Sequence, residues 1–146
     1  MTAVRFEGAQ AARPAPGVLE ALQAAELIVI APSNPYISIW PILAVGEIRA
    51  ALEGRDVPAV AVSPLVGGRA IKGPADRLLE RMAGGTSPAH VAGCYEGLID
   101  VLVIDEADDG ASLDPSVRTV VTRTLMTDPA ARRALAEVVL GCLSSV

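Results

Sequence analysis

Four short apolar runs, separated by segments with helical spacing, constrain the fold of this chain more than any other feature. The first run, Leu27-Ile28-Val29-Ile30-Ala31, is apolar at odd and even positions alike. A run of this kind is typical of a parallel strand that is buried on both faces. The other three runs are residues 59–62, 101–104 and 119–122.

The segments between these runs have the features of helices. Apolar residues recur at helical spacing, prolines stand in first turns, and Asp128 is placed to cap the last segment. Strands separated by helices imply right-handed crossovers. The prediction is therefore an α/β fold, Rossmann-like, with a mainly parallel sheet and helices on both faces. One helix is expected to begin near residue 16, and four others are expected over residues 41–52, 74–82, 88–97 and 128–143. A glycine-rich loop is expected over residues 63–73.

The composition fits one globular domain and excludes several classes of partner. The chain has 146 residues, of which 51% are hydrophobic and 20% charged, so a single α/β domain over residues 1–146 is expected. Its apolar runs are far shorter than the roughly 18 residues that cross a bilayer. The first residues lack a signal-peptide pattern, and a cytoplasmic protein without a membrane partner is expected. The net charge of −5, without a basic block, argues against nucleic acid.

The two cysteines carry no metal or redox pattern. Cys94 and Cys142 are far apart in sequence and lack the spacing of metal ligands, so both are expected to be reduced core thiols. His90 is the only histidine, which rules out a cluster of His and Cys ligands. No Gly-x-Ser-x-Gly elbow supports a Ser-His-Asp triad. No catalytic residue and no metal ligand is assigned from these patterns.

The loop after the first run is a candidate ligand site. In open parallel sheets, ligands bind beyond the carboxyl ends of the strands. This loop carries Ser33, Asn34 and Ser38, whose hydroxyl and amide groups can bind a ligand, in a stretch stiffened by two prolines. The alternative is a helix cap and a turn, in which Ser and Asn are also common.

The glycine-rich loop after the second run is a candidate anion site. Gly67 and Gly68 can let backbone N–H groups converge on a phosphate, and Arg69 and Lys72 add positive charge before a helix start. The Lys-Ser/Thr ending of a Walker A loop is missing. An ordinary glycine turn is the alternative, and Asp76 can simply favour the helix N-terminus.

The third run is followed by the acidic stretch Asp105-Glu106-Ala107-Asp108-Asp109. Carboxylates at a strand end can hold Mg²⁺, usually together with substrate phosphates. An acidic surface loop is the alternative interpretation.

These loops, in their order along the chain, resemble motifs of the 2-phospho-L-lactate transferase family. The resemblance covers nearly the whole chain, and two of its strings are specific. They are Ala31-Pro32-Ser33-Asn34-Pro35 and Lys72-Gly73-Pro74-Ala75-Asp76, accompanied by Ser63-Pro64-Leu65-Val66-Gly67-Gly68, Asp105-Glu106-Ala107-Asp108 and Thr124-Leu125-Met126.

The resemblance implies a transferase of coenzyme F420 biosynthesis. Such an enzyme moves a phospholactyl group, or in some bacteria a phosphoenolpyruvyl group, from a guanosine diphosphate ester to the terminal ribityl hydroxyl of the deazaflavin Fo and releases GMP, with Mg²⁺ neutralising charge. The implied contacts are with the phosphates or sugar of the donor. The substrate-binding residues that it implies are Ser33, Asn34, Ser38, Gly67, Gly68, Lys72 and Asp76.

The chain departs from the family pattern in length and at Trp40. Family members are considerably longer and begin with a strand and a Gly-Gly-rich nucleotide loop, followed by acidic residues that bind the metal. The chain is therefore expected to correspond to the C-terminal half of the transferase fold, incomplete at the N-terminus, with the Mg²⁺ ligands in the other half. The expected partners are a separate N-terminal half or further copies of the chain. Trp40 stands where a small residue is usual and is expected to narrow the pocket.

Two alternatives to a transferase stay open. The same superfamily includes gluconeogenesis-factor-like proteins that bind a nucleotide sugar, so the chain can be a non-enzymatic nucleotide-binding regulator. Their loop is typically Pro-Gly-Ser-x-Tyr-x-Ser, whereas the Asn34-Pro35 pair of this chain favours the transferase. The second alternative is an inactive fragment.

Overall fold

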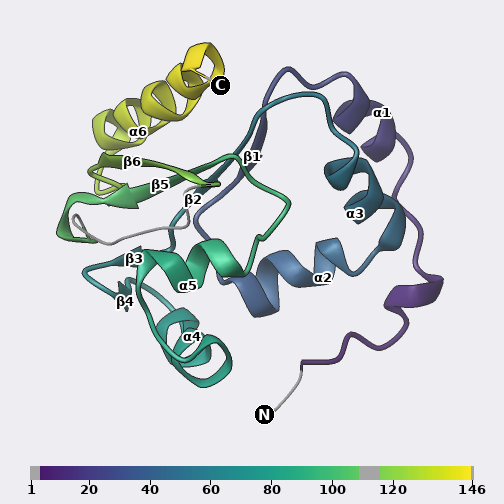
Figure 1. Cartoon of the computed structure of the whole chain (residues 1–146), viewed down its shortest axis with the longest axis horizontal. Helices are drawn as coiled ribbons and strands as arrows, with labels where there is room; N and C mark the ends of the chain where they lie inside the picture. The colour runs from purple at the N-terminus through teal and green to yellow at the C-terminus, as the bar shows by residue number, and fades with distance from the viewer. Residues whose placement is uncertain (1–3, 109–115, 146) are drawn as a thin grey trace.

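The four apolar runs form one parallel sheet. The computed structural model describes residues 4–108 and 116–145. In it the strands lie in the order β1-β2-β5-β6, and every neighbouring pair is parallel (Figure 1). The predicted α/β fold with a mainly parallel sheet is confirmed. The strands are β1 (Ile28–Ile30), β2 (Ala59–Val62), β5 (Val101–Asp105) and β6 (Arg118–Thr122).

Helices cover both faces of this sheet. Figure 1 shows α6 on one side and α2, α4 and α5 on the other. The cap expected at the last helix is present, since the Asp128 carboxylate accepts a hydrogen bond from the Ala131 N–H at 2.8 Å. The α-helices are α1 (Val18–Gln23), α2 (Trp40–Leu43), α3 (Gly46–Glu53), α4 (Ala75–Ala83), α5 (Pro88–Gly93) and α6 (Pro129–Gly141). Shorter helical turns are η1 (Ala9–Ala11), η2 (Pro35–Ile39), η3 (Glu106–Asp108) and η4 (Cys142–Ser145).

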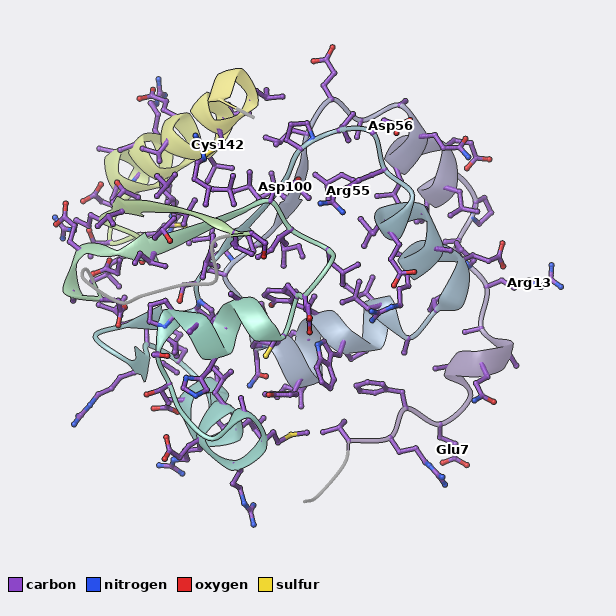
Figure 2. The ribbon with its side chains drawn as sticks, in the orientation of Figure 1. Glu7, Arg13, Arg55, Asp56, Asp100 and Cys142 are labelled. Carbon is purple, nitrogen blue, oxygen red and sulfur yellow. The ribbon has the colours of Figure 1, made fainter. Side chains whose placement is uncertain are left out.

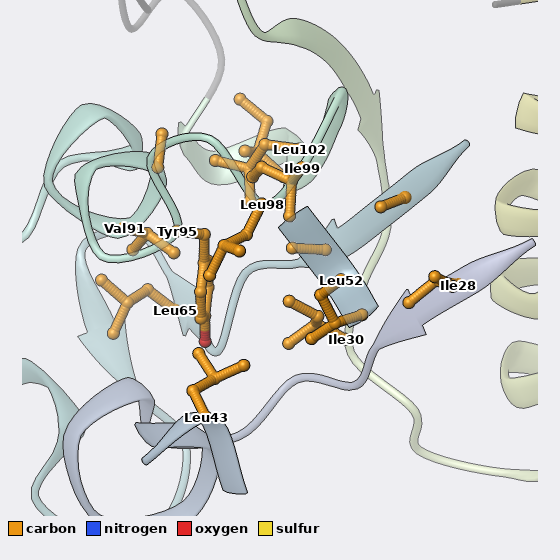
Figure 3. Packing of buried hydrophobic residues seen from close by; sticks show 14 of the residues in the cluster. Ile28, Ile30, Leu43, Leu52, Leu65, Val91, Tyr95, Leu98, Ile99 and Leu102 are labelled. Carbon is orange, nitrogen blue, oxygen red and sulfur yellow. The ribbon is translucent and has the colours of Figure 1, made fainter. Parts of the chain in front are cut away.

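Strand β2 is buried on both faces, which explains why its sequence is apolar at every position. Ala59 and Ala61 belong to the larger core cluster, which also contains buried side chains of α2, α3, α4 and α5. Val60 and Val62 belong to a second cluster under α6. Figure 3 shows part of the larger cluster around Tyr95. Because both faces of the strand are covered by helices, neither can be polar.

The stretch 63–73, expected as a loop, contains a hairpin. It is built from β3 (Leu65–Val66) and β4 (Arg69–Ala70), which pair in antiparallel fashion. Gly67 and Gly68 connect the two strands, and their φ angles are 58° and 71°. Two consecutive residues with positive φ make the tight turn whose twist matches a hairpin, and glycine adopts this conformation at little cost.

The helix expected over residues 41–52 is instead two helices, α2 and α3, preceded by the π-helical turn η2. Val45 lies between the helices with extended backbone angles, φ −78° and ψ 104°, and α3 begins at Gly46. A β-branched residue followed by glycine is a weak place in a helix, which accounts for the break. The helix expected over 88–97 is also shorter and ends at Gly93.

The cysteines lie where they were expected. Cys94 is partly buried, Cys142 is buried, and both are free thiols. Within residues 4–108 and 116–145, no helix combines the length and apolar character needed to cross a bilayer. The cytoplasmic location expected from the sequence stays a prediction.

Candidate functional site

An open pocket lies at one edge of the sheet. Because all four strands are parallel, their carboxyl ends meet at this edge, where ligands of such sheets bind. The pocket has a volume of about 490 Å³. Its lining comes from the segments that follow β1, β2 and β6, from Val66 of β3 and from the loop between β4 and α4.

Asn34 lines the pocket and leaves its amide NH₂ group without a partner among the described residues. Its Oδ1 accepts hydrogen bonds from the N–H groups of Tyr36 at 3.0 Å and Ile37 at 3.4 Å, at the start of η2. These bonds fix which end of the amide is the oxygen. The Nδ2 atom is buried and has no hydrogen-bond partner in the described part of the chain. An unsatisfied buried donor costs about 1–3 kcal/mol, so an acceptor oxygen of a ligand would be stabilised there.

Lys72 supplies the positive charge of the pocket. Among the described residues that line the pocket, Lys72 alone carries a charge. Gly73, Pro74 and Ala75 line the pocket beside it and lead into α4, so this helix of nine residues begins at the pocket. The ammonium group and the helix N-terminus both favour an anion. The pocket can therefore attract an anionic ligand although the chain as a whole has a net charge of −5.

Four of the predicted substrate-binding residues are brought together by the fold. Ser33, Asn34 and Ser38 line the pocket from the segment after β1, and Lys72 lines it from the loop after β4. The segments are about 40 residues apart in sequence, so the grouping is a product of the parallel sheet and not of local structure. Asn34 is also a helix cap, so both interpretations of this loop apply to the same side chain.

The other three predicted residues, Gly67, Gly68 and Asp76, are not among the described residues that line the pocket. The Gly67 N–H donates to Oδ2 of Asp108 at 3.0 Å, and the Gly68 N–H donates to Oδ1 at 2.7 Å. The glycine turn thus binds a carboxylate of the chain itself. Asp76 lies in the first turn of α4 and accepts a hydrogen bond from the Arg77 N–H at 2.8 Å. Contact of these three residues with a substrate stays a prediction.

Asp105 is a buried carboxylate at the end of β5, with 6% of its surface exposed. Its Oδ2 accepts hydrogen bonds from the N–H of Thr124 at 2.8 Å and from the hydroxyl of Thr124 at 3.0 Å. Its Oδ1 accepts a third from the Ala107 N–H at 3.0 Å. Burial by itself raises the pKa of Asp105, but these hydrogen bonds and the charge of Arg123 outweigh burial and hold the pKa below its ordinary value. The carboxylate is therefore ionised at neutral pH.

The described aspartates at the end of β5 and in η3 are engaged by donors of the protein. Asp105 and Asp108 each bind protein donors through both carboxylate oxygens. Across the described ranges, no group of three or more His, Cys, Asp or Glu side chains is placed to hold a metal ion. Asp109 falls outside the described residues. The sequence suggested either carboxylates that hold Mg²⁺ or an acidic surface loop. Asp105 does not fit a surface loop, because it is buried and binds backbone N–H groups.

Two polar residues that line the pocket were not assigned from the sequence. Ser63 follows β2, is 2% exposed, and its Oγ accepts a hydrogen bond from the Leu65 N–H at 3.2 Å. Thr124 follows β6 and binds Asp105. Both line the pocket. Their position within two residues of a strand end was the signal that could have identified them.

Trp40 does not line the pocket, so the expectation that it narrows the pocket is wrong. Its ring packs edge-on against Tyr36, with ring centroids 4.7 Å apart and 71° between the planes. Its Nε1 donates a hydrogen bond to the carbonyl oxygen of Cys94 at 3.1 Å. Burial raises the pKa of both Tyr36 and Cys94, which are therefore neutral at pH 7. Trp40 joins η2 to α5 as part of the packing.

Comparison with known proteins agrees with the loop motifs. The family model described as 2-phospho-L-lactate transferase CofD matches residues 1–139. The chain belongs to this family. The resemblance identified from the loop motifs is thereby confirmed.

Several curated relatives are similar over most of this chain. A phosphoenolpyruvate transferase of Streptomyces griseus is 42% identical over 143 residues, which is 95% of this chain and 45% of the relative. A 2-phospho-L-lactate transferase of Methanopyrus kandleri is 40% identical over 128 residues, which is 86% of this chain and 40% of the relative. One from Methanothermobacter thermautotrophicus is 37% identical over 132 residues, which is 88% of this chain and 42% of the relative. The chain thus spans less than half the length of these relatives.

Proposed function

We propose that this chain supplies the donor-binding part of a transferase in coenzyme F420 biosynthesis. The donor is a guanosine diphosphate ester of a small phosphorylated acid, and the acceptor is the deazaflavin Fo. Membership of the family supports the reaction class. The observation that carries the assignment of the pocket is the buried Nδ2 of Asn34, which has no partner within the described residues and belongs to the same pocket lining as the positive charge of Lys72.

The reaction is a transfer at the distal phosphorus of the donor. The ribityl hydroxyl oxygen of Fo forms a bond to this phosphorus and gives up its proton to water. The bond from the phosphorus to the bridging oxygen breaks, and GMP leaves with the electron pair. Charge on the phosphate oxygens must be stabilised throughout, so positioning and electrostatic stabilisation account for most of the rate.

The residues of the pocket have distinct roles in this proposal. Lys72 and the start of α4 attract the diphosphate, and Asn34 Nδ2 donates a hydrogen bond to one of its oxygens. Ser33 and Ser38 bind the remaining phosphate or sugar oxygens. No residue of this chain is assigned to proton transfer.

Gly67, Gly68 and Asp76 have supporting roles in the proposal. The two glycines keep the hairpin short, and the hairpin leads through Ile71 to Lys72. Asp76 orients the first turn of α4, through its hydrogen bond with the Arg77 N–H. A direct contact of these three residues with the donor is kept as part of the proposal.

Magnesium belongs to the proposal through the family resemblance. When bound, the ion would neutralise charge on the donor phosphates. The described carboxylates at this edge are engaged with protein donors, so we propose that the ligands come from the part of the family fold that lies outside residues 1–146. A companion polypeptide with the remaining part of the family fold, or a second copy of this chain, would complete the site.

Turnover tests the proposal. The chain is assayed for GMP release with the guanosine diphosphate ester of 2-phospho-L-lactate or of phosphoenolpyruvate, Fo and Mg²⁺. It is assayed alone and together with the part of the Streptomyces griseus phosphoenolpyruvate transferase that the match leaves out. We expect negligible release by the chain alone and release in the mixture. The donor that is used faster identifies the acid.

Three results would contradict parts of the proposal. Robust turnover by the chain alone would show that it needs no companion. Binding of GDP without turnover in any mixture would favour a nucleotide-binding regulator. Absence of both binding and turnover would favour an inactive fragment.

A further inference from the structure

One corner of the fold binds two segments that carry pocket residues. The corner consists of residues 105–108, at the end of β5 and in η3. From it, Asp105 binds the backbone N–H and the hydroxyl of Thr124. Leu125 and Met126, which follow directly, line the pocket. Asp105 and Thr124 are each 6% exposed, so this contact is shielded from water.

The second carboxylate of the corner, Asp108, binds the hairpin that leads to Lys72. Asp108 accepts the N–H groups of Gly67 and Gly68, about 40 residues away in sequence, one on each oxygen. These glycines form the turn between β3 and β4. A Cβ at Gly68 would lie 3.2 Å from Thr86 Oγ1, so Thr86 packs closely against the turn. Ile71 and Lys72 follow β4 and line the pocket.

We propose that Asp105 and Asp108 are positioning residues that hold the two walls of the pocket at a fixed separation. Neither is among the residues that line the pocket within the described ranges, so both act through the segments they bind. Asp105 sets the place of the 124–126 segment, and Asp108 sets the place of the hairpin that carries Lys72. The proposal rests on the proposed function, in that the pocket binds the diphosphate of a guanosine nucleotide.

The chemistry of the contacts explains why carboxylates stand at both positions. Each side chain accepts hydrogen bonds on both oxygens, and an ionised acceptor binds N–H donors more strongly than a neutral one. An asparagine would place an NH₂ group against one of these N–H donors. The corner is therefore built to fix backbone, and it links the walls through a segment of only four residues.

The first measurement tests whether the two aspartates hold the segments that they bind. Amide hydrogen exchange is compared in the wild-type chain, Asp105→Asn, Asp108→Asn and Glu106→Gln. Glu106 is exposed and belongs to the same corner, so its variant is a matched control for loss of charge. We expect exchange at Gly67 and Gly68 to rise about ten-fold or more in Asp108→Asn, and exchange at Thr124 to rise similarly in Asp105→Asn. Exchange unchanged from the control would overturn the proposal.

The second measurement follows the ligand. GDP affinity is determined by calorimetry, and we expect a loss of about five-fold in Asp105→Asn and Asp108→Asn and none in Glu106→Gln. If Asp108 acts through Lys72, Asp108→Asn should cost less affinity in a Lys72→Ala background than in the wild type. Additive losses would show a general structural effect and would contradict the positioning role.

The two proposals fail in different ways. If the wild-type chain and its mixture with the companion polypeptide do not bind GDP, the proposed function fails, and the exchange data still decide whether the corner holds the walls. If wild type binds GDP and both Asp variants bind it as tightly as Glu106→Gln, the pocket is real and the positioning role is wrong.

Discussion

The Nη2 of Arg55 donates to both carboxylate oxygens of Asp100, at 2.9 and 3.0 Å, across 45 residues of sequence (Figure 2). Asp100 also accepts the N–H of Ala59 at 2.8 Å, and Arg55 Nη1 donates to the Leu52 carbonyl at 2.9 Å. Asp100 precedes β5 and Ala59 begins β2, so the pair joins the two central strands at the edge opposite to the pocket.

Arg55→Ala should lower the free energy of unfolding by about 1–3 kcal/mol, because it removes charged hydrogen bonds from a side chain that is only 10% exposed. Urea denaturation measures the change. The control is Arg49→Ala, since Arg49 and Glu53 form an ion pair on one face of α3 with side chains 49% and 51% exposed. Its loss should cost at most about 0.5 kcal/mol. Equal effects of the two variants would show that the buried pair adds no special stability.

Lys72→Ala should weaken GDP binding by about ten-fold or more, because charge-assisted hydrogen bonds contribute roughly 1.5–3 kcal/mol. Asn34→Ala should weaken it as well, and should also lower stability because two N–H groups of η2 lose their acceptor. Arg81→Ala, on the exposed side of α4, is the control for loss of a cation. Calorimetry on the chain, or on its mixture with the companion polypeptide, gives the affinities. Lys72→Ala binding as tightly as the control would remove Lys72 from the site.

The stability of the chain should depend on Asp105 in acid. The pKa of Asp105 is lower in the folded chain than the value of about 3.9 for an unfolded one. Its contribution to stability is therefore fully present above about pH 4 and is lost as the pH falls through the lowered folded pKa. The difference in unfolding free energy between wild type and Asp105→Asn should be constant from about pH 5 to 7 and shrink below about pH 4. A difference that did not change with pH would mean that ionisation of Asp105 plays no part.

The sheet should make the chain self-associate through β1. Helix α6 is about 10 Å wide and strands lie about 4.8 Å apart, so one helix covers about two strands. Val29 of β1 is 47% exposed, although its neighbour in register, Val60, is fully buried. Val29→Lys should reduce association measured by light scattering at a series of concentrations. Val121→Lys, on β6 at the other edge, is the control. A chain that stays monomeric at every concentration would contradict this prediction.

The sheet was predictable because burial leaves a direct mark on sequence. Strands β2 and β5 are covered on both faces, so they had to be apolar at every position, and their limits were predicted to within one residue. The β3–β4 hairpin was missed because its strands have only two residues each. Gly67 and Gly68 suit a hairpin turn and an anion loop equally well, since both need backbone angles that other residues avoid.

The grouping of the pocket was predictable in part. Ser33, Asn34, Ser38 and Lys72 follow strands or the hairpin, and a parallel sheet brings strand ends together. The contact of Asp108 with the glycine turn was not predictable, because no spacing along the chain relates residues about 40 positions apart. An acidic stretch after a strand carries the same sequence pattern whether it binds a metal or the backbone.

The hairpin has its own counter-anion, since Asp108 occupies the two N–H groups of its turn. The conformation of the hairpin therefore does not depend on a bound phosphate. For protein engineering, residues 71–73 are therefore the positions to substitute, because the hairpin before them is held by its own contacts. Substitutions there can alter the preferred anion while the turn, anchored elsewhere, is left intact.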